Sequence, residues 1–270
     1  MFAYRDQTSF SAFTIGSVPT GFVETPRSSS ERIILFCHGG GFQVGSICSH
    51  FGLVRRLADA AHARVLAFDY RLAPEHRCPA ALEDAVSVYR WLLDRGTPPS
   101  RIVLAGDSAG GALAVGIAVA ARNNGLPMPA CLALISPWLD LAMRGESYSS
   151  RAELDIFSKP HQLAAMSRAY LGRHRNALDP LASPVEADLS GLPPIIIHAA
   201  DHDITRDDSF LFAERARQYD VKVTLRVWPG LFHHFQMFGE LSASKESLAE
   251  LGRFIIERIS DATDGPGADI

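Results

Sequence analysis

Six short apolar runs rich in β-branched residues recur along the chain, and they constrain its fold more than any other feature. The runs lie at residues 33–37, 65–68, 102–105, 131–135, 195–199 and 223–227. Helix-like segments, with apolar residues three and four positions apart, separate most of them. Strands that alternate with helices are typical of a mostly parallel sheet covered by helices on both faces. The sequence therefore predicts an α/β fold.

The same periodicity predicts the other elements. Helices are expected at residues 50–61, 79–93, 109–122, 206–219 and 243–259, and a strand pair at 10–15 and 21–25, followed by a linker at 26–30. Residues 140–194 break the alternation, with polar turns, one helix-like stretch at 159–171 and a proline-rich region. Because insertions near the carboxyl ends of strands often shape the ligand site, we interpret this segment as a lid or pocket wall; the alternative is a solvent-facing loop and helix pair.

Length and composition are those of one ordinary globular domain. The chain has 270 residues, of which 47% are hydrophobic and 21% are charged. We predict a single domain over residues 1–260 and a disordered tail at 261–270, which contains Gly-Pro-Gly. The net charge of −4 provides no basic surface for nucleic acid, so nucleic-acid binding is not expected.

Neither a membrane span nor a secretory signal is expected. The longest apolar run, residues 112–121, is about half of the roughly 20 residues that a spanning helix needs. The N-terminus has no cationic stretch followed by an apolar one, which predicts a cytoplasmic protein. The cysteines are widely spaced, which favours free thiols over disulfides or a metal site, and no metal or organic cofactor is expected. They are Cys37, Cys48, Cys78 and Cys131.

Ser108 lies in the sequence Gly-Asp-Ser-Ala-Gly-Gly at residues 106–111, between a predicted strand and a predicted helix. A serine flanked by glycines at such a junction can occupy a sharp turn that exposes its hydroxyl above the edge of the sheet. The alternative is a serine that only caps the following helix. The apolar strand before the motif and the small-residue helix after it favour a nucleophile.

A serine nucleophile needs a base to accept its proton and donors to hold the developing oxyanion. Residues 38–42 read His-Gly-Gly-Gly-Phe directly after a predicted strand, and consecutive glycines let backbone N–H groups converge without side chains in the way. We predict that the amides of Gly40 and Gly41, together with that of Ala109, form the oxyanion hole. The alternative is a merely flexible turn. His38 is expected to hold the glycine loop by hydrogen bonding.

With these motifs the chain resembles the hormone-sensitive-lipase-like family of α/β hydrolases, the bacterial esterases and lipases that carry a His-Gly-Gly-Gly motif. The resemblance extends from about residue 33 to residue 238 and follows the family's motif order. Besides the two motifs above, it includes Asp-Tyr-Arg-Leu-Ala-Pro-Glu-His at 69–76, Pro-Ala-Ala-Leu-Glu-Asp-Ala at 79–85 and Ser-Pro-Trp at 136–138. It implies an α/β-hydrolase fold whose catalytic triad runs serine, acid, histidine along the chain.

The resemblance implies that His233 is the general base. Ten histidines are present, and the family pattern of glycine, two apolar residues, histidine, any residue and phenylalanine matches the segment after the last predicted strand. His234 is the less favoured neighbour. The alternative for His233 is a hydrogen-bonded loop histidine without a catalytic role.

The family's spacing places the triad acid at Asp203, which would orient His233 and stabilise its protonated form. Thr205 departs from the leucine usual at that position, and Asp201 is the second candidate. Asp207 and Asp208 fit better at the start of the next helix, where negative charge is favourable.

Other residues of the shared motifs are expected to support the site. Phe42 and Trp138 are predicted to line the substrate pocket because both follow strand ends on the side where the nucleophile emerges, although either could equally be packing. Arg71 and Glu75 are expected to tie a loop beneath the glycine turn.

The sequence thus predicts a serine hydrolase of short-chain or acetyl carboxylic esters that forms an acyl-enzyme. A deacetylase or lactonase of specialised metabolism with the same triad is the alternative. A non-catalytic small-ligand receptor is disfavoured because the triad residues are all present. A peptidase of this fold is disfavoured because the chain has no room for the propeller or large cap domain that such peptidases usually carry.

The resemblance also bears on access and assembly. Family members commonly carry a longer N-terminal region whose helices cap the active site, whereas only 37 residues precede His38 here, so a shortened N-terminal cap is expected. Family members often dimerise, which makes a homodimer the expected partner besides the small-molecule ester.

Overall fold

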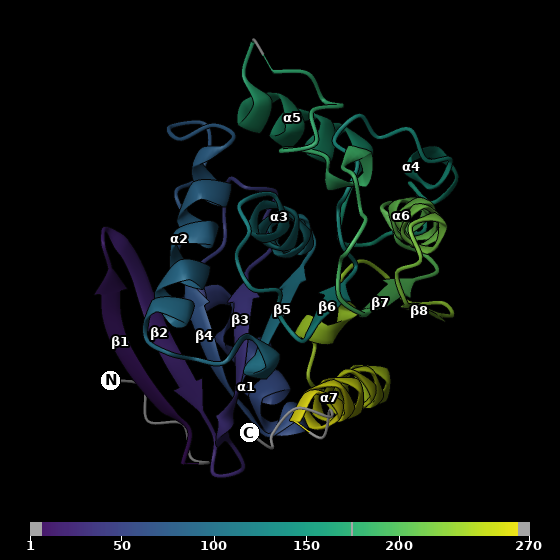
Figure 1. Cartoon of the computed structure of the whole chain (residues 1–270). Coiled ribbons are helices and arrows are strands. Elements are labelled where there is room, and N and C mark those ends of the chain that lie inside the picture. The colour runs from purple at the N-terminus through teal and green to yellow at the C-terminus, as the bar shows by residue number, and fades with distance from the viewer. Residues whose placement is uncertain (1–6, 174, 264–270) are drawn as a thin grey trace.

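A twisted sheet of eight strands forms the centre of the molecule (Figure 1). The computed structural model describes residues 7–173 and 175–263. The strands are β1 (Ser9–Ile15), β2 (Val18–Glu24), β3 (Ser29–Cys37), β4 (Ala63–Phe68), β5 (Ile102–Asp107), β6 (Cys131–Ile135), β7 (Ile195–Ala200) and β8 (Val223–Trp228). Their order in the sheet is β1-β2-β4-β3-β5-β6-β7-β8.

The sheet is mostly parallel, as the sequence predicts. Strands β3 to β8 pair in parallel, whereas β1 and β2 are antiparallel to their neighbours at one edge. Every residue of β5 is buried, because a central parallel strand has helices over both of its faces. The expected strands are confirmed with shifted ends; β3, for example, begins at Ser29, inside the predicted linker.

Helices cover both faces of the sheet. They are α1 (Ile47–Ala61), α2 (Ala80–Asp94), α3 (Ala109–Asn123), α4 (Ser147–Ser150), α5 (Pro160–Leu171), α6 (Arg206–Gln218) and α7 (Ser242–Thr263), with short 3-10 helices η1 (Pro99–Arg101), η2 (Pro184–Glu186) and η3 (Phe235–Met237). Apolar residues of α1 and α7 join one core cluster, and those of α2, α3 and α6 join the cluster on the opposite face. Of the expected tail, residues 261–263 belong to α7, and residues 264–270 lie outside the described residues.

The insertion, residues 140–194, leaves the sheet between β6 and β7 and contains α4, α5 and η2. Figure 1 shows α4 and α5 beyond the edge at which the parallel strands end. The Phe42 ring, at the end of the glycine loop (residues 38–42), stacks on the Tyr170 ring of α5 at 3.9 Å between centroids. A Cβ at Gly41 would collide with the Met166 sulfur of the same helix. The insertion therefore lies against the glycine loop, at the carboxyl edge of the sheet.

Two observations bear on the expectations drawn from composition. No helix within residues 7–173 and 175–263 is both long enough and apolar enough to cross a bilayer. All four cysteines are free thiols, and Cys48 is the exposed one.

Candidate active site

Ser108 lies on the turn between β5 and α3. Its backbone angles are φ 52° and ψ −123°, a strained conformation for a residue with a side chain. Three backbone hydrogen bonds hold this turn. The Ser108 amide donates to Ile135 O at 3.0 Å, and Ser108 O accepts from the amides of Trp138, at 2.9 Å, and Gly111, at 3.0 Å. The Ser108 side chain does not cap α3, so the helix-capping alternative is wrong.

Small residues around Ser108 let three backbone segments meet closely. A Cβ at Gly106 would collide with the Gly110 carbonyl, and a Cβ at Gly110 would collide with the Cys37 carbonyl at the end of β3. The N-terminus of α3 therefore lies directly against the strand that leads into the glycine loop. This close approach brings Ser108 and the loop to one place at the sheet edge.

The structure brings Ser108, His233 and Asp203 into one hydrogen-bonded line. His233 Nε2 lies 2.9 Å from Ser108 Oγ, and His233 Nδ1 lies 2.9 Å and 3.0 Å from the two carboxylate oxygens of Asp203. All three side chains are buried. They come from the β5–α3 turn, the loop after β8 and the loop after β7, which meet because parallel strands end at one edge.

Thr205 holds the Asp203 carboxylate from its own loop. Its amide and its hydroxyl both donate to Asp203 Oδ1, at 2.7 Å and 2.9 Å. From the sequence alone, Thr205 is only a departure from the family pattern. A hydroxyl two residues after an aspartate was the signal that could have revealed this contact.

The electrostatics of the His233–Asp203 pair favour the ion pair. Burial works to lower the pKa of His233, but the Asp203 charge and hydrogen bond outweigh burial and raise it above its ordinary value. Burial works to raise the pKa of Asp203, whereas the His233 charge, the hydrogen bond from His233 and those from Thr205 lower it. The carboxylate can therefore orient the imidazole and stabilise its protonated form.

Asp201, the second candidate for the acid, lies elsewhere. Its side chain is 39% exposed and pairs with Arg206 at 3.2 Å. Asp207 and Asp208 lie in the first turn of α6, as expected. Asp208 is buried and accepts the amides of Leu139 and Asp140, both at 2.9 Å.

The glycine loop is anchored through the residue before the nucleophile. The Gly39 amide donates to Asp107 Oδ1 at 2.9 Å. In contrast, no hydrogen bond among the described residues uses the amides of Gly40, Gly41 or Ala109 as donors. Positive φ angles of 116° at Gly40 and 61° at Gly41 give the loop its course. Three N–H groups near Ser108 are thus left for a ligand.

Asp107 joins two histidines beneath this loop. Its Oδ2 atom lies 2.9 Å from His234 Nδ1 and 3.3 Å from His50 Nε2. His234, the less favoured base, is therefore bound to Asp107. Burial works to raise the pKa of Asp107, but the charges of His50 and His234 and the hydrogen bonds from both outweigh burial and lower it below its ordinary value. Sequence reasoning missed the part played by Asp107 and His50.

His38 also holds the loop. Its Nδ1 atom lies 2.7 Å from Gly39 O, and the Tyr70 hydroxyl donates to His38 O at 2.8 Å. The Tyr70 ring stacks on the His38 ring at 4.2 Å. Burial, ahead of every other influence, lowers the pKa of His38 to about 4. A neutral imidazole in this place suits a structural role.

Phe42 and Trp138 are both buried in the larger core cluster, with their ring centroids 6.1 Å apart. Arg71 holds its loop as expected, because its guanidinium pairs with Asp84, at 2.8 Å, and with Glu83, at 3.0 Å, both near the start of α2. Glu75, which was expected to take part in buried hydrogen bonds of the same loop, is exposed.

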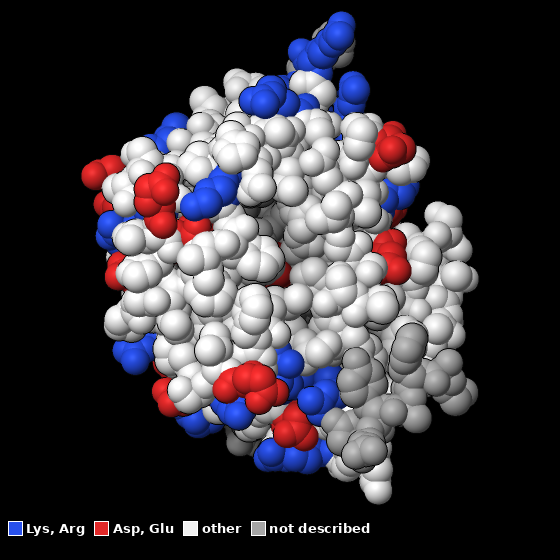
Figure 2. All heavy atoms as spheres, turned by 180° about the vertical axis from the view of Figure 1, so that it is seen from behind, with Lys and Arg blue, Asp and Glu red and all other residues white. Residues whose placement is uncertain are grey.

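Partly exposed apolar side chains lie near the triad histidine and the glycine loop. Phe157 of the insertion is 49% exposed, and its ring lies edge-on to His234 at 4.3 Å. Phe238 lies 6.4 Å from Phe157 between centroids, and Val44 lies beside Gly40. Figure 2 shows the face opposite to that of Figure 1, with a hollow near its middle surrounded mostly by uncharged residues.

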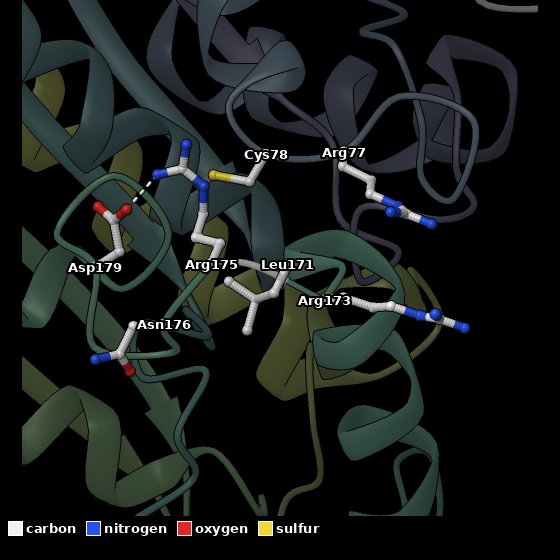
Figure 3. A pocket seen from close by; sticks show the side chains of 7 residues that line it. All are labelled: Arg77, Cys78, Leu171, Arg173, Arg175, Asn176 and Asp179. Atoms are coloured by element: carbon white, nitrogen blue, oxygen red, sulfur yellow. Dashed lines mark hydrogen bonds and ion pairs between the residues drawn. The ribbon is translucent and has the colours of Figure 1, made fainter.

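A separate pocket of about 410 Å³ lies at the end of α5 (Figure 3). It is lined by Arg77, Cys78, Leu171, Arg173, Arg175, Asn176 and Asp179. Arg175 points toward Asp179 and pairs with it, whereas Arg77 and Arg173 extend away from that pair. None of the predicted catalytic residues lines this pocket.

Metal-ligating atoms gather in one place within the described residues. A carboxylate oxygen of Asp155, one of Asp203 and a ring nitrogen of His233 lie within 4.8 Å of one another. Because His233 and Asp203 already bond to each other, we assign no metal to this group.

Comparisons with known proteins agree with the fold described above. A family model described as "alpha/beta hydrolase fold" matches residues 34–237. An acetyl-hydrolase of Streptomyces hygroscopicus is 40% identical over 90% of this chain and 81% of its own. An esterase of Acinetobacter venetianus is 36% identical over 84% of this chain and 76% of its own. The crystal structure of an esterase from the bacterial hormone-sensitive lipase family superimposes with a TM-score of 0.93, at 38% identity, over 96% of this chain and 87% of that one.

Proposed function

The chain belongs to the α/β-hydrolase family, and we propose that it is a serine esterase of short-chain carboxylic esters, acetyl esters above all. One observation carries the proposal. The Ser108 hydroxyl is hydrogen-bonded to a buried imidazole whose other nitrogen is bonded to a buried carboxylate. This is the arrangement that turns a serine hydroxyl, a poor nucleophile near neutral pH, into an effective one.

In the proposed acylation step, Ser108 Oγ attacks the ester carbonyl carbon while His233 Nε2 accepts the hydroxyl proton. Asp203 holds the proton on His233 Nδ1, so that Nε2 is free to act as the base. The protonated His233 then donates its Nε2 proton to the leaving alkoxide. The alcohol departs, and the acyl group remains on Ser108.

In the proposed deacylation step, water attacks the acyl carbon while His233 Nε2 accepts its proton. The bond between the acyl carbon and Ser108 Oγ then breaks, His233 returns the proton to Ser108 Oγ, and the carboxylic acid departs. Both steps pass through a tetrahedral intermediate with a negative oxygen. We assign the amides of Gly40, Gly41 and Ala109 to this oxygen. The support is that these N–H groups have no acceptor within the described chain, whereas the Gly39 amide is already bonded to Asp107.

The proposed preference for small acyl groups rests on the similarity of this chain to its relatives. Relatives named acetyl-hydrolase occur in Streptomyces hygroscopicus and Mycobacterium tuberculosis, at 40% and 35% identity. The insertion, which lies against the glycine loop through Tyr170 and Met166, would act as a cap and limit the space beside Ser108. The cytoplasmic location and the homodimer stay predictions from the sequence.

Substitution of the nucleophile tests the proposal. Ser108→Ala should lower hydrolysis of p-nitrophenyl acetate by at least about 10⁴-fold and abolish labelling by a fluorophosphonate. Ser87→Ala is the matched control. Within the described residues the Ser87 hydroxyl donates to Asp84 O of the same helix at 2.7 Å, so the activity of this variant should stay unchanged. Folding of both variants is compared by circular dichroism.

Retained turnover in folded Ser108→Ala would contradict the proposed mechanism. Failure of a fluorophosphonate to label the unmodified protein would favour the non-catalytic receptor instead. A series of esters with graded acyl and alcohol groups, extended to acetylated compounds and lactones, then separates an esterase from a deacetylase or a lactonase.

A further inference from the structure

Asp155 is a buried carboxylate close to the triad that belongs to the insertion. Its side chain is fully buried. One of its oxygens lies within 4.8 Å of an Asp203 oxygen and of a His233 ring nitrogen. Burying a carboxylate beside another one is costly unless both are well bonded or a cation is close.

The hydrogen bonds of Asp155 connect the insertion to the loop of the triad acid. Oδ1 accepts the amides of Phe157 and Ser158, at 2.9 Å and 3.1 Å, and so closes a turn within the insertion. Oδ2 accepts the amide of Ile204 at 3.1 Å. Ile204 directly follows Asp203, so this bond holds the backbone that carries the triad carboxylate.

Other contacts from the same part of the insertion hold that loop on both sides of Asp203. The Ser147 hydroxyl donates to Ile204 O at 2.7 Å, and Arg151 Nε donates to Asp201 O at 3.0 Å. Asp155 differs from these two in that its polar atoms also lie beside His233. It therefore combines a structural anchor with a negative charge near the reacting group.

We propose that Asp155 is a positioning residue of the esterase reaction, which fixes the acid loop and provides a second negative charge beside His233. The inference rests on the proposed function. During both steps His233 becomes an imidazolium ion, and a fixed negative charge within about 5 Å stabilises that ion without reorganisation. Asp155 acts through His233 and Asp203 and has no assigned contact with the substrate.

The charged and titratable groups around His233 define what should be measured. Asp203 faces it from the loop after β7, Asp155 from the insertion, Asp107 from the end of β5 and His234 from its own loop. Burial lowers the pKa of His233, and the three carboxylates raise it, with Asp203 the strongest of them. Loss of the Asp155 charge should therefore make His233 easier to deprotonate.

The experiment compares Asp155→Asn and Asp155→Ser with Glu153→Gln. Asparagine and serine can each still close the turn at Phe157 and Ser158 but carry no charge. Glu153 is exposed in the same segment, so its substitution removes a carboxylate without touching the site. For each protein, kcat and kcat/KM on p-nitrophenyl acetate are measured from about pH 5 to about pH 9, a range that spans the ordinary pKa of histidine.

Both Asp155 variants should show kcat lowered about tenfold or more, with KM changed far less. Their acid limb of kcat/KM should move down by about one pH unit, because neutral His233 then persists to lower pH. Glu153→Gln should match the unmodified enzyme. A fall in activity without a shift of the acid limb would overturn the proposal, since it would leave Asp155 a purely structural residue. Failure of both Asp155 variants to fold, while Glu153→Gln folds, would overturn it for the same reason.

Fluorophosphonate labelling of the unmodified enzyme separates this inference from the proposed function. If Ser108 is labelled and the limb does not move in either Asp155 variant, only the role of Asp155 is refuted. If the unmodified enzyme is neither labelled nor active, the esterase proposal itself fails, and the role of Asp155 fails with it.

Discussion

Replacement of Asp203 by asparagine should disable the enzyme while leaving its shape nearly intact. The carboxylate accepts a hydrogen bond from His233 Nδ1 at 2.9 Å. It also accepts hydrogen bonds from the amide and the hydroxyl of Thr205, at 2.7 Å and 2.9 Å. An asparagine has a single acceptor oxygen, and Thr205 can occupy it. Its NH₂ group would then face His233 Nδ1, which favours the tautomer with the proton on Nε2. That tautomer presents a donor to Ser108 where a base is required.

The expected loss follows from the geometry. A unit-charge pair 2.9 Å apart interacts by about 6 kcal/mol at an effective dielectric constant of about 20. This energy is available only after His233 becomes charged, so it lowers the barrier and not the energy of the resting enzyme. A change of about 5 to 6 kcal/mol in the barrier corresponds to about a 10⁴-fold fall in kcat.

The assay is steady-state hydrolysis of p-nitrophenyl acetate, with Asp201→Asn as the matched control. Asp201 is two residues away, and its partly exposed side chain pairs with Arg206. Exposed pairs contribute at most about 1 kcal/mol to stability, so Asp201→Asn should keep its activity within about twofold. A larger loss for Asp201→Asn than for Asp203→Asn would refute the assignment of the triad acid, as would Asp203→Asn with more than about a tenth of the normal kcat.

Two further predictions concern stability. Gly110→Ala should lower the free energy of unfolding by about 3 kcal/mol in urea titrations, because the added methyl group would collide with the Cys37 carbonyl. Gly52→Ala in α1 is the control. Its methyl group would meet only the end of a flexible side chain, so this variant should be as stable as the unmodified protein or more stable by up to about 1 kcal/mol. Equal stability of the two variants would contradict the close approach of α3 to β3. Burial lowers the pKa of His198 to about 3 from its ordinary 6.5, so the unfolded chain takes up a proton between these values and the folded protein does not. The free energy of unfolding should therefore fall as the pH drops from 6.5 toward 3. His198→Gln should reduce the slope of this free energy against pH by about 1.4 kcal/mol per pH unit, measured by thermal or urea unfolding. An unchanged slope would show that the imidazole is protonated in the folded state.

Local patterns predicted most of the architecture, because the periodicity of apolar residues follows directly from how a strand or a helix exposes its faces. The six apolar runs all became strands of one sheet. Element ends were less well predicted. β3 begins inside the predicted linker, and α7 ends inside the predicted tail. Strand pairing and helix packing can extend an element beyond the residues whose local preference favours it.

The nucleophile and its glycine loop were also identifiable from the sequence, since each is a short motif whose chemistry resides in consecutive residues. The order of the triad along the chain, carried by the family resemblance, pointed to His233 and Asp203. What the resemblance did not provide is the hydrogen bonding that distinguishes Asp203 from Asp201, which depends on how the loop after β7 turns.

The sequence by itself determined the alternation of strands and helices, the serine turn and the glycine loop, because each depends on neighbouring residues. Only the tertiary structure decided the partners that come from distant segments: Asp84 for Arg71, the Gly39 amide for Asp107, and the acid loop for Asp155. These contacts form where chain segments meet at the carboxyl edge of the sheet. Their specificity comes from backbone amides and buried carboxylates brought within 3 Å or so, a spacing that no local pattern encodes.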